Sequence, residues 1–178
     1  MRRQVRAFAV TVGVLAALGA VAGLTWSWVA PRAPYLPTDR GLILADPTTQ
    51  ALIAADGWFA IITGVLGLAC GMVAWWRGRE TGLAVVLGLA AGGVLASFVT
   101  YWVGTRFTVG AATVAAAAPG LDVVGGLDLT TQSVLVSWAF MALAVYAAIE
   151  GVLLYRRSPL RQPYGAQPYN GGIARLPE

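Results

Sequence analysis

Three ionisable side chains stand inside or beside long apolar runs, and they are the residues best placed to do chemistry. Asp56 lies in LIAADGWFA, Glu150 lies in AVYAAIEGVLLY, and Arg106 follows YWVGT. A carboxylate within a membrane is costly in free energy and is a proton or cation site by default. Each carboxylate also lies within about two helical turns of the end of its run, where an arginine can pair with it.

The ion-pair alternative names specific partners. On the side of Asp56 the arginines are Arg32, Arg40 and Arg106. We expect Asp56 to contact Arg106, directly or through water, and to hold the ends of two helices together. On the side of Glu150 the corresponding arginines are Arg77, Arg79 and Arg157.

Other kinds of catalytic and metal site lack their residues. The 178 residues include no histidine and one cysteine, Cys70. The usual zinc sites, haem ligation and Ser–His–Asp triads depend on histidine, and an internal disulfide needs a second cysteine. The glycines lie inside apolar runs, and they form no phosphate-binding loop. We therefore expect no enzyme activity, no catalytic residue, no cofactor and no metal.

Four apolar stretches are long enough to cross a membrane. Of all residues 58% are hydrophobic and 11% are charged, whereas a soluble domain has about 25% charged residues. A helix needs about 20 mainly apolar residues to cross the bilayer. The four stretches are residues 7–30, 51–76, 81–103 and 132–155. We predict an all-α integral membrane protein, whose residues 1–157 form a four-transmembrane-helix bundle.

The arginines predict the orientation of this bundle. All twelve basic residues are arginine, and nine of them lie before the first stretch, between the second and third, or after the fourth. By the positive-inside rule both termini are cytoplasmic, which makes the chain a multi-pass protein of the inner (plasma) membrane. Arginines at membrane edges favour anionic lipids as partners, and not nucleic acid. The Pro- and Gln-rich residues 158–178 predict a disordered cytoplasmic tail.

One polar phrase occurs twice, as DPTTQ from Asp46 and as DLTTQ from Asp128. Each copy precedes a stretch that runs inward, so each aspartate is a predicted helix N-cap. The echo has two interpretations. A duplication would give two tandem helical hairpins related by an axis normal to the membrane. The other interpretation is coincidence, because aspartate and threonine commonly begin helices.

Glycines recur at spacings that are typical of helix packing in lipid. Small residues allow two helix backbones to approach closely. We favour contacts within one bundle over contacts between copies of the chain. The predicted packing residues are Gly19, Gly23, Gly57, Gly64, Gly67, Gly71, Gly88 and Gly92.

Three segments resemble one family of small membrane proteins. They are ADGWFAIITGVLGLACGMVAWWRGRE, the FVTYWVGTRF end of the third stretch, and VLVSWAFMALAVYAAIEGV. Together they resemble an actinobacterial family of small four-span membrane proteins, to which exclusive use of arginine and a high alanine and glycine content are suited. That family is of unknown function, so the resemblance implies no catalytic or binding residues.

Two functions remain open from the sequence. The first is a non-enzymatic protein of the cell envelope, structural or accessory, which packs with lipids, with another membrane protein or with its own copies. The alternative is a small transporter or a permease-like transporter subunit. A transporter would need polar side chains along a water-filled path. The side chains available for one are Thr63, Ser97, Thr100, Ser137 and Tyr146.

Overall fold

Four long helices account for most of the fold. The computed structural model describes residues 2–38, 41–77, 82–107 and 123–158. The helices are α1 (Arg2–Val29), α2 (Ala51–Arg77), α3 (Gly82–Arg106) and α5 (Ser137–Arg157), and the short 3-10 helix η1 (Gln132–Val136) leads directly into α5. All four, with η1 counted into the last, are long and apolar enough to cross a membrane, as predicted. Nearly all of the predicted tail, residues 159–178, lies outside the described residues.

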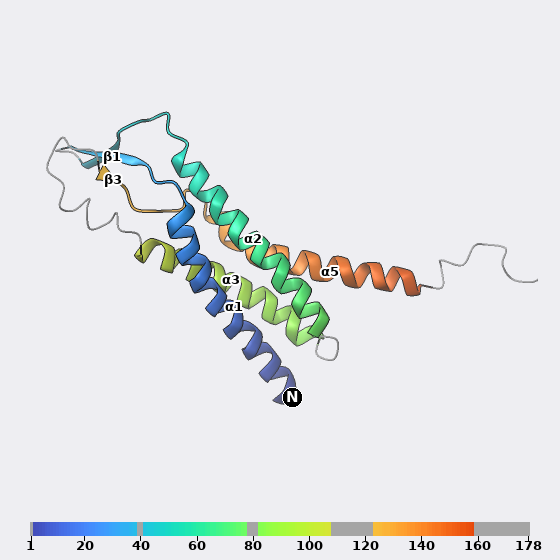
Figure 1. Cartoon of the computed structure of the whole chain (residues 1–178). Coiled ribbons are helices and arrows are strands. Elements are labelled where there is room, and N and C mark those ends of the chain that lie inside the picture. Colours follow the sequence, from blue (N-terminus) through green and yellow to red (C-terminus); the bar gives the residue numbers. More distant parts are fainter. Residues whose placement is uncertain (1, 39–40, 78–81, 108–122, 159–178) are drawn as a thin grey trace, which may run out of the picture.

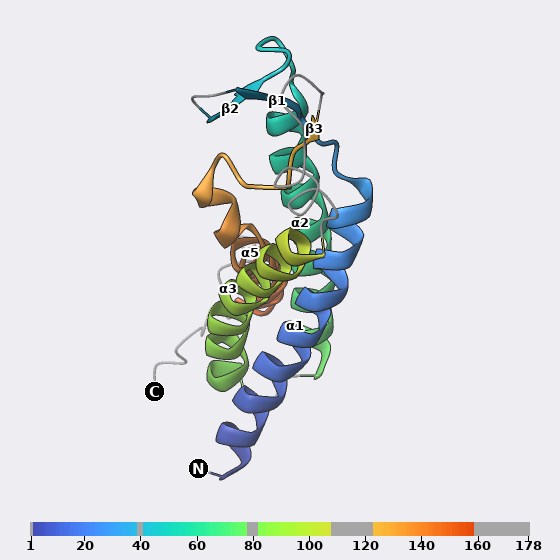
Figure 2. The same ribbon diagram turned by 90° about the vertical axis from the view of Figure 1, so that its left-hand side faces the viewer.

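The helices associate as two parallel pairs. α1 packs along α3, and α2 packs along α5, whereas α2 contacts α1 and α3 much less. These pairs join the helices that would be equivalent in two tandem hairpins, α1 with α3 and α2 with α5. Whether the two hairpins superpose stays a prediction. Figures 1 and 2 show that α1 begins and α5 ends at the same end of the molecule.

A constant register joins α1 to α3. Contacting residues are 77 positions apart in the sequence, as in Thr11 with Gly88 and Gly19 with Ala96. The contacts advance four residues at a time along both helices, so each helix presents one continuous face to the other. Thr100 of α3 links the two helices, because its hydroxyl donates a hydrogen bond to the Gly19 carbonyl oxygen of α1 at 3.0 Å.

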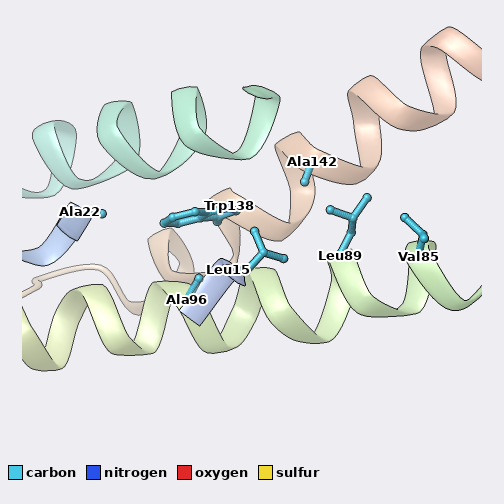
Figure 3. Close-up of a cluster of buried hydrophobic side chains, with 7 residues drawn as sticks. All are labelled: Leu15, Ala22, Val85, Leu89, Ala96, Trp138 and Ala142. Carbon is cyan, nitrogen blue, oxygen red and sulfur yellow. The ribbon is translucent and has the colours of Figure 1, made fainter. Parts of the chain in front are cut away.

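The core where three helices meet is built around one tryptophan. Trp138 of α5 is completely buried and lies between α2 and α3 (Figure 3). It belongs to a cluster with Leu15 of α1 and with Leu89 of α3. Full burial of such side chains contributes roughly 1.5–3 kcal/mol each relative to water, although in lipid the contribution comes from close packing.

A small sheet lies at the end of the molecule opposite the start of α1 and the end of α5. The prediction of an all-α protein is wrong for this part of the chain. β1 (Pro34–Thr38) pairs antiparallel with β2 (Gly41–Leu44) and with β3 (Val123–Val124), in the order β2-β1-β3. Figure 2 shows the sheet beyond the ends of α1 and α2. The strands are short, and prolines in PYLPT keep β1 extended. Apolar alternation over four or five residues was too brief a signal to predict them.

A second cluster of buried side chains holds α1 and α2 together at the end of the molecule near the sheet. Trp26 of α1 and Phe59 of α2 are both fully buried, and their rings meet edge to face at 5.2 Å between centroids. The Trp26 indole N–H donates to the Ala55 carbonyl oxygen at 2.9 Å. This hydrogen bond is a buried polar link between α1 and α2.

Replacing Trp26 with phenylalanine is expected to lower the free energy of unfolding by about 1 kcal/mol, because the indole hydrogen bond is lost. Trp28→Phe is the matched control, since Trp28 is on the same helix and is 90% exposed. Unfolding of both variants in detergent micelles measures the difference. An equal effect of the two substitutions would contradict the assigned role of Trp26.

Candidate functional site: a polar clamp over the helix ends

The Asp56 carboxylate binds the backbone of residues 130 and 131, which are distant from it in the sequence. Its Oδ1 accepts a hydrogen bond from the Thr130 N–H at 3.1 Å, and its Oδ2 accepts one from the Thr131 N–H at 3.0 Å. Asp56 is 8% exposed, although it lies only five residues after the first residue of α2. A carboxylate that accepts two N–H groups forms charge-assisted bonds, which are roughly twice as strong as neutral ones. We call Asp56, Tyr101 and Asp128 the clamp.

The direct contact predicted between Asp56 and Arg106 is wrong, and the contact through water stays a prediction. The Arg106 guanidinium carbon lies 5.9 Å from the centroid of the Trp102 ring, in a cation–π arrangement. Arg32 donates to the Ser27 carbonyl oxygen at 2.9 Å, at the end of α1. Asp56 instead faces residues 130 and 131, which bring one N–H group to each of its carboxylate oxygens. Arg40 lies outside the described residues.

Asp128 holds the same segment to α3. Its Oδ1 accepts from the Tyr101 hydroxyl and from the Leu129 N–H, both at 2.8 Å. It caps no helix, because η1 begins at Gln132 after Thr131, which makes no side-chain capping bond. Leu127 and Leu129 pack onto the Trp26 cluster beneath. Residues 127–131, which we call the cap segment, are thus fixed by two carboxylates above an apolar base.

The first copy of the polar phrase makes a different local structure. Asp46 Oδ1 accepts from the Thr48 N–H at 2.8 Å and from the Thr48 hydroxyl at 2.7 Å. α2 begins at Ala51, whose N–H donates to Thr49 Oγ1 at 3.3 Å. The prediction that Asp46 caps this helix is wrong, because its side chain closes a turn with Thr48 before the helix begins at Ala51. Asp56 consequently lies about 7.5 Å along the axis from the first residue of α2.

The two hydrogen bonds from Thr48 hold the pKa of Asp46 below its ordinary value of 3.8. A lowered pKa in the folded state stabilises the turn above the unfolded pKa, and this stabilisation is lost as the pH falls through the folded value. We expect Thr48→Val to raise the pKa of Asp46 toward 3.8. An NMR titration of the Asp46 carboxyl carbon measures this shift, and Thr49→Val is the control. An unchanged pKa in Thr48→Val would contradict the assignment.

Glu150 meets a tryptophan at the other end of the molecule. The Trp75 indole N–H donates to Glu150 Oε2 at 3.0 Å, which joins the far ends of α2 and α5. The predicted arginine partners Arg77 and Arg157 lie in the last turns of these helices, and Arg79 lies outside the described residues. The structure keeps Asp56 and Glu150 apart, since Asp56 lies near the start of α2, whereas Glu150 of α5 contacts Trp75 near the end of α2.

Six of the eight predicted packing glycines lie against a neighbouring helix. A methyl group on Gly19 would lie 2.5 Å from the Ala96 carbonyl oxygen, and one on Gly67 would lie 2.6 Å from that of Trp138. The other four are Gly23, Gly71, Gly88 and Gly92. Gly57 and Gly64 are different: a methyl group on Gly57 would meet nothing within 4 Å, and one on Gly64 only Met141 at 3.8 Å. Gly57 is exposed, so the prediction of helix packing is wrong for it, whereas Gly64 is buried against α5 with room for a methyl group.

Two more glycines have close helix contacts that were not predicted. A methyl group on Gly93 would lie 2.7 Å from the Ala139 Cα, and one on Gly104 would overlap the Trp26 ring. The sequence did contain a signal for the second. Small residues recur in α3 at every fourth position, as Gly88, Gly92, Ala96, Thr100 and Gly104.

Polar side chains within the helices are used mainly to join helices or to satisfy their own backbone. The hydroxyls of Thr63 in α2 and Ser137 in α5 lie 2.6 Å apart, and Ser137 also donates to the Val134 carbonyl oxygen. Thr63 and Ser137 are among the polar residues that a water-filled path between the helices would have needed. Among the described residues, no three histidine, cysteine, aspartate or glutamate side chains gather where they could hold a metal ion.

Comparisons of the chain with protein-family models, with curated proteins and with solved structures find no match. The resemblance to a family of actinobacterial four-span proteins therefore stays a prediction.

Proposed function

We propose that this chain is a multi-pass protein of the cell membrane, with both termini in the cytoplasm, and that it is a structural or accessory component without enzymatic activity. Four apolar helices support the membrane placement. Arg2, Arg3 and Arg6 begin α1, and Arg156 and Arg157 end α5, at the same end of the molecule (Figure 1). An excess of arginine at one end favours the cytoplasmic side for that end.

The observation that carries the accessory role is an unoccupied helix face on α5. Beyond its contacts with α2, α5 extends away from the other helices (Figure 1). Ala144, Ala147, Ala148 and Gly151 are exposed there, and a methyl group on Gly151 would meet nothing within 4 Å. In lipid, faces of small residues favour close packing with another helix. We infer that this face of α5 receives a helix of a partner protein or of a second copy.

The arrangement of the polar groups argues against the transporter alternative. A coupled transport site needs a polar group that exchanges between protein and water near the midplane. Asp56 is occupied by two backbone N–H groups at the helix end. Thr63, Ser137 and Thr100 are hydrogen-bonded within or between helices. The groove between α1, α2 and α3 is lined almost entirely by apolar side chains and includes neither carboxylate.

Thiol labelling of single-cysteine variants in intact cells tests the orientation. With Cys70 replaced by alanine, cysteines at Thr38, Asp46 and Asp128 are expected to react with an impermeant maleimide. A cysteine at Arg157 is expected to react only after permeabilisation. Pro119 and Arg79, which lie outside the described residues, extend the test to the remaining outer and inner loops. Labelling at Arg79 or Arg157 in intact cells would contradict the proposed orientation.

Photo-cross-linking tests the accessory role. A photoreactive amino acid at Ala147 or Gly151 is expected to give a protein adduct of defined mass in native membranes. The matched control is the same amino acid at Leu87 of α3, which is 54% exposed in the same apolar environment. An adduct at twice the mass of the chain would identify a second copy as the partner. Only lipid adducts at both α5 positions would refute the proposal.

A further inference from the structure

An apolar groove runs between α1 and α2. Its volume is about 730 Å³, and its walls include Ala7, Leu18, Leu66 and Ala69. Its floor is formed by side chains of α1 and α3 that belong to the buried core, among them Leu89. The groove exists because these two helices pack mainly against other partners, α1 against α3 and α2 against α5.

The groove has the length of one membrane leaflet. On α2 it runs from Leu66 to Arg77 and on α1 from Ala7 to Leu18. Each of these segments rises about 16 Å. The hydrocarbon core of a bilayer is roughly 30 Å thick, so one leaflet contributes about half of that. A lipid acyl chain that lay in the groove would therefore be accommodated along its length.

Charge is concentrated at one end of this groove. Among the described residues that line the groove, Arg77 alone is charged, and it lies at the end where α2 finishes. On the opposite wall the arginine-rich first turns of α1 lead directly to Ala7. Basic residues at the cytoplasmic mouth of a cleft between membrane helices favour a lipid phosphate.

From these observations we infer that the groove binds an anionic phospholipid of the cytoplasmic leaflet, with an acyl chain along the apolar walls and the phosphate at Arg77. The inference rests on the proposed placement of the chain in the membrane. It assigns the groove to a lipid and leaves the α5 face to a protein. The head group distinguishes this lipid from bulk lipid, because the phosphate and Arg77 attract each other at the membrane surface.

Native mass spectrometry of the full chain from mixed phosphatidylglycerol and phosphatidylcholine nanodiscs tests the inference. The wild-type chain is expected to retain phosphatidylglycerol preferentially. Arg77→Gln is expected to weaken this retention about fivefold, which is the contribution of one arginine near a charged surface. Arg157→Gln is the control, since it removes an arginine at the same end of the molecule but outside the groove.

Filling the groove gives a second, independent arm. Ala69→Trp and Val73→Trp place bulk in the groove wall and are expected to remove the bound lipid of either class. Met72→Trp is the matched control, because Met72 is on the same helix, is 50% exposed and does not line the groove.

Equal lipid retention in Arg77→Gln and Arg157→Gln, together with equal retention in Ala69→Trp and Met72→Trp, would overturn the inference. Loss of a dimer in Ala69→Trp, with lipid retention unchanged, would also overturn it and would identify a second copy as the occupant. Failure of the proposed function is separate, since the membrane orientation is measured by thiol labelling and the accessory role by cross-linking at α5.

Discussion

Replacing Gly71 with alanine is expected to lower the free energy of unfolding by about 1–3 kcal/mol, the usual cost of overpacking. The added methyl group would overlap the Ala142 carbonyl oxygen and the Val145 Cγ1 on α5. A backbone oxygen cannot rotate away as a side chain can, so α5 must move as a whole. Because α5 holds Trp138, the movement would also loosen the core in Figure 3. Unfolding in mixed detergent micelles measures the loss.

Gly64→Ala is the matched control for this substitution. Gly64 lies on the same helix, two turns earlier, and a methyl group there would meet only Met141 at 3.8 Å. Both changes have the same effect on helix propensity, so their difference isolates the contact with α5. Gly13→Ala serves the same purpose for α1, where Gly19→Ala is expected to be destabilising. Equal stabilities of Gly71→Ala and Gly64→Ala would contradict the parallel α2–α5 pair.

Replacing Asp56 with leucine is expected to release the cap segment. The N–H groups of Thr130 and Thr131 would lose their acceptor in a part-buried position. Because Thr130 and Thr131 are exposed residues, water can hydrate the freed N–H groups, and the loss is that of two hydrogen bonds to a charged group, about 1.5–3 kcal/mol each. Asp56→Asn is expected to have a smaller effect, because its amide oxygen can accept one of the two bonds. Hydrogen exchange at the amides of Thr130 and Thr131 measures the release directly.

Arg106→Gln separates this account from the ion-pair account of Asp56. If Arg106 supported Asp56, its removal would increase exchange at Thr130 and Thr131 as Asp56→Leu does. The structure places Arg106 over Trp102 instead, so exchange at both amides is expected to stay unchanged. A matching increase in Arg106→Gln would contradict the clamp as described.

The four helices could be predicted from the sequence because their signal is local. A run of about 20 apolar residues predicts a membrane-spanning helix from its own composition, whatever the rest of the chain contains. Close contacts at Gly19 and Gly71 were predictable for the same reason, since small residues at helical spacing form a face. Gly57 and Gly64 share this spacing but not the contact. Spacing identifies a face of a helix, but it does not identify which helix covers that face.

The contact of Asp56 within the clamp could not be predicted because its donors are backbone atoms. Side-chain types suggested Arg106 as the partner of Asp56, whereas the actual donors are N–H groups 74 and 75 residues away. Every residue except proline has such a group, so no residue type marks the donor. The repeated polar phrase shows the same limit. Asp46 closes a turn with Thr48, whereas Asp128 receives the Tyr101 hydroxyl.

Disulfide cross-linking in native membranes tests the central claim, which is that four membrane-spanning helices form the parallel pairs α1–α3 and α2–α5. A Cβ at Gly92 would lie 3.5 Å from the Leu15 Cβ, within the range of about 3.5–4.5 Å for a disulfide. In a chain with Cys70 replaced by alanine, Leu15→Cys with Gly92→Cys is therefore expected to cross-link under mild oxidation. Gly67→Cys with Met141→Cys is also expected to cross-link after a small separation of α2 and α5, because their Cβ atoms would lie 3.2 Å apart, just below this range. Gly13→Cys with Gly92→Cys is expected to stay reduced. Cross-linking of the Gly13 pair in place of the Leu15 pair would contradict the account.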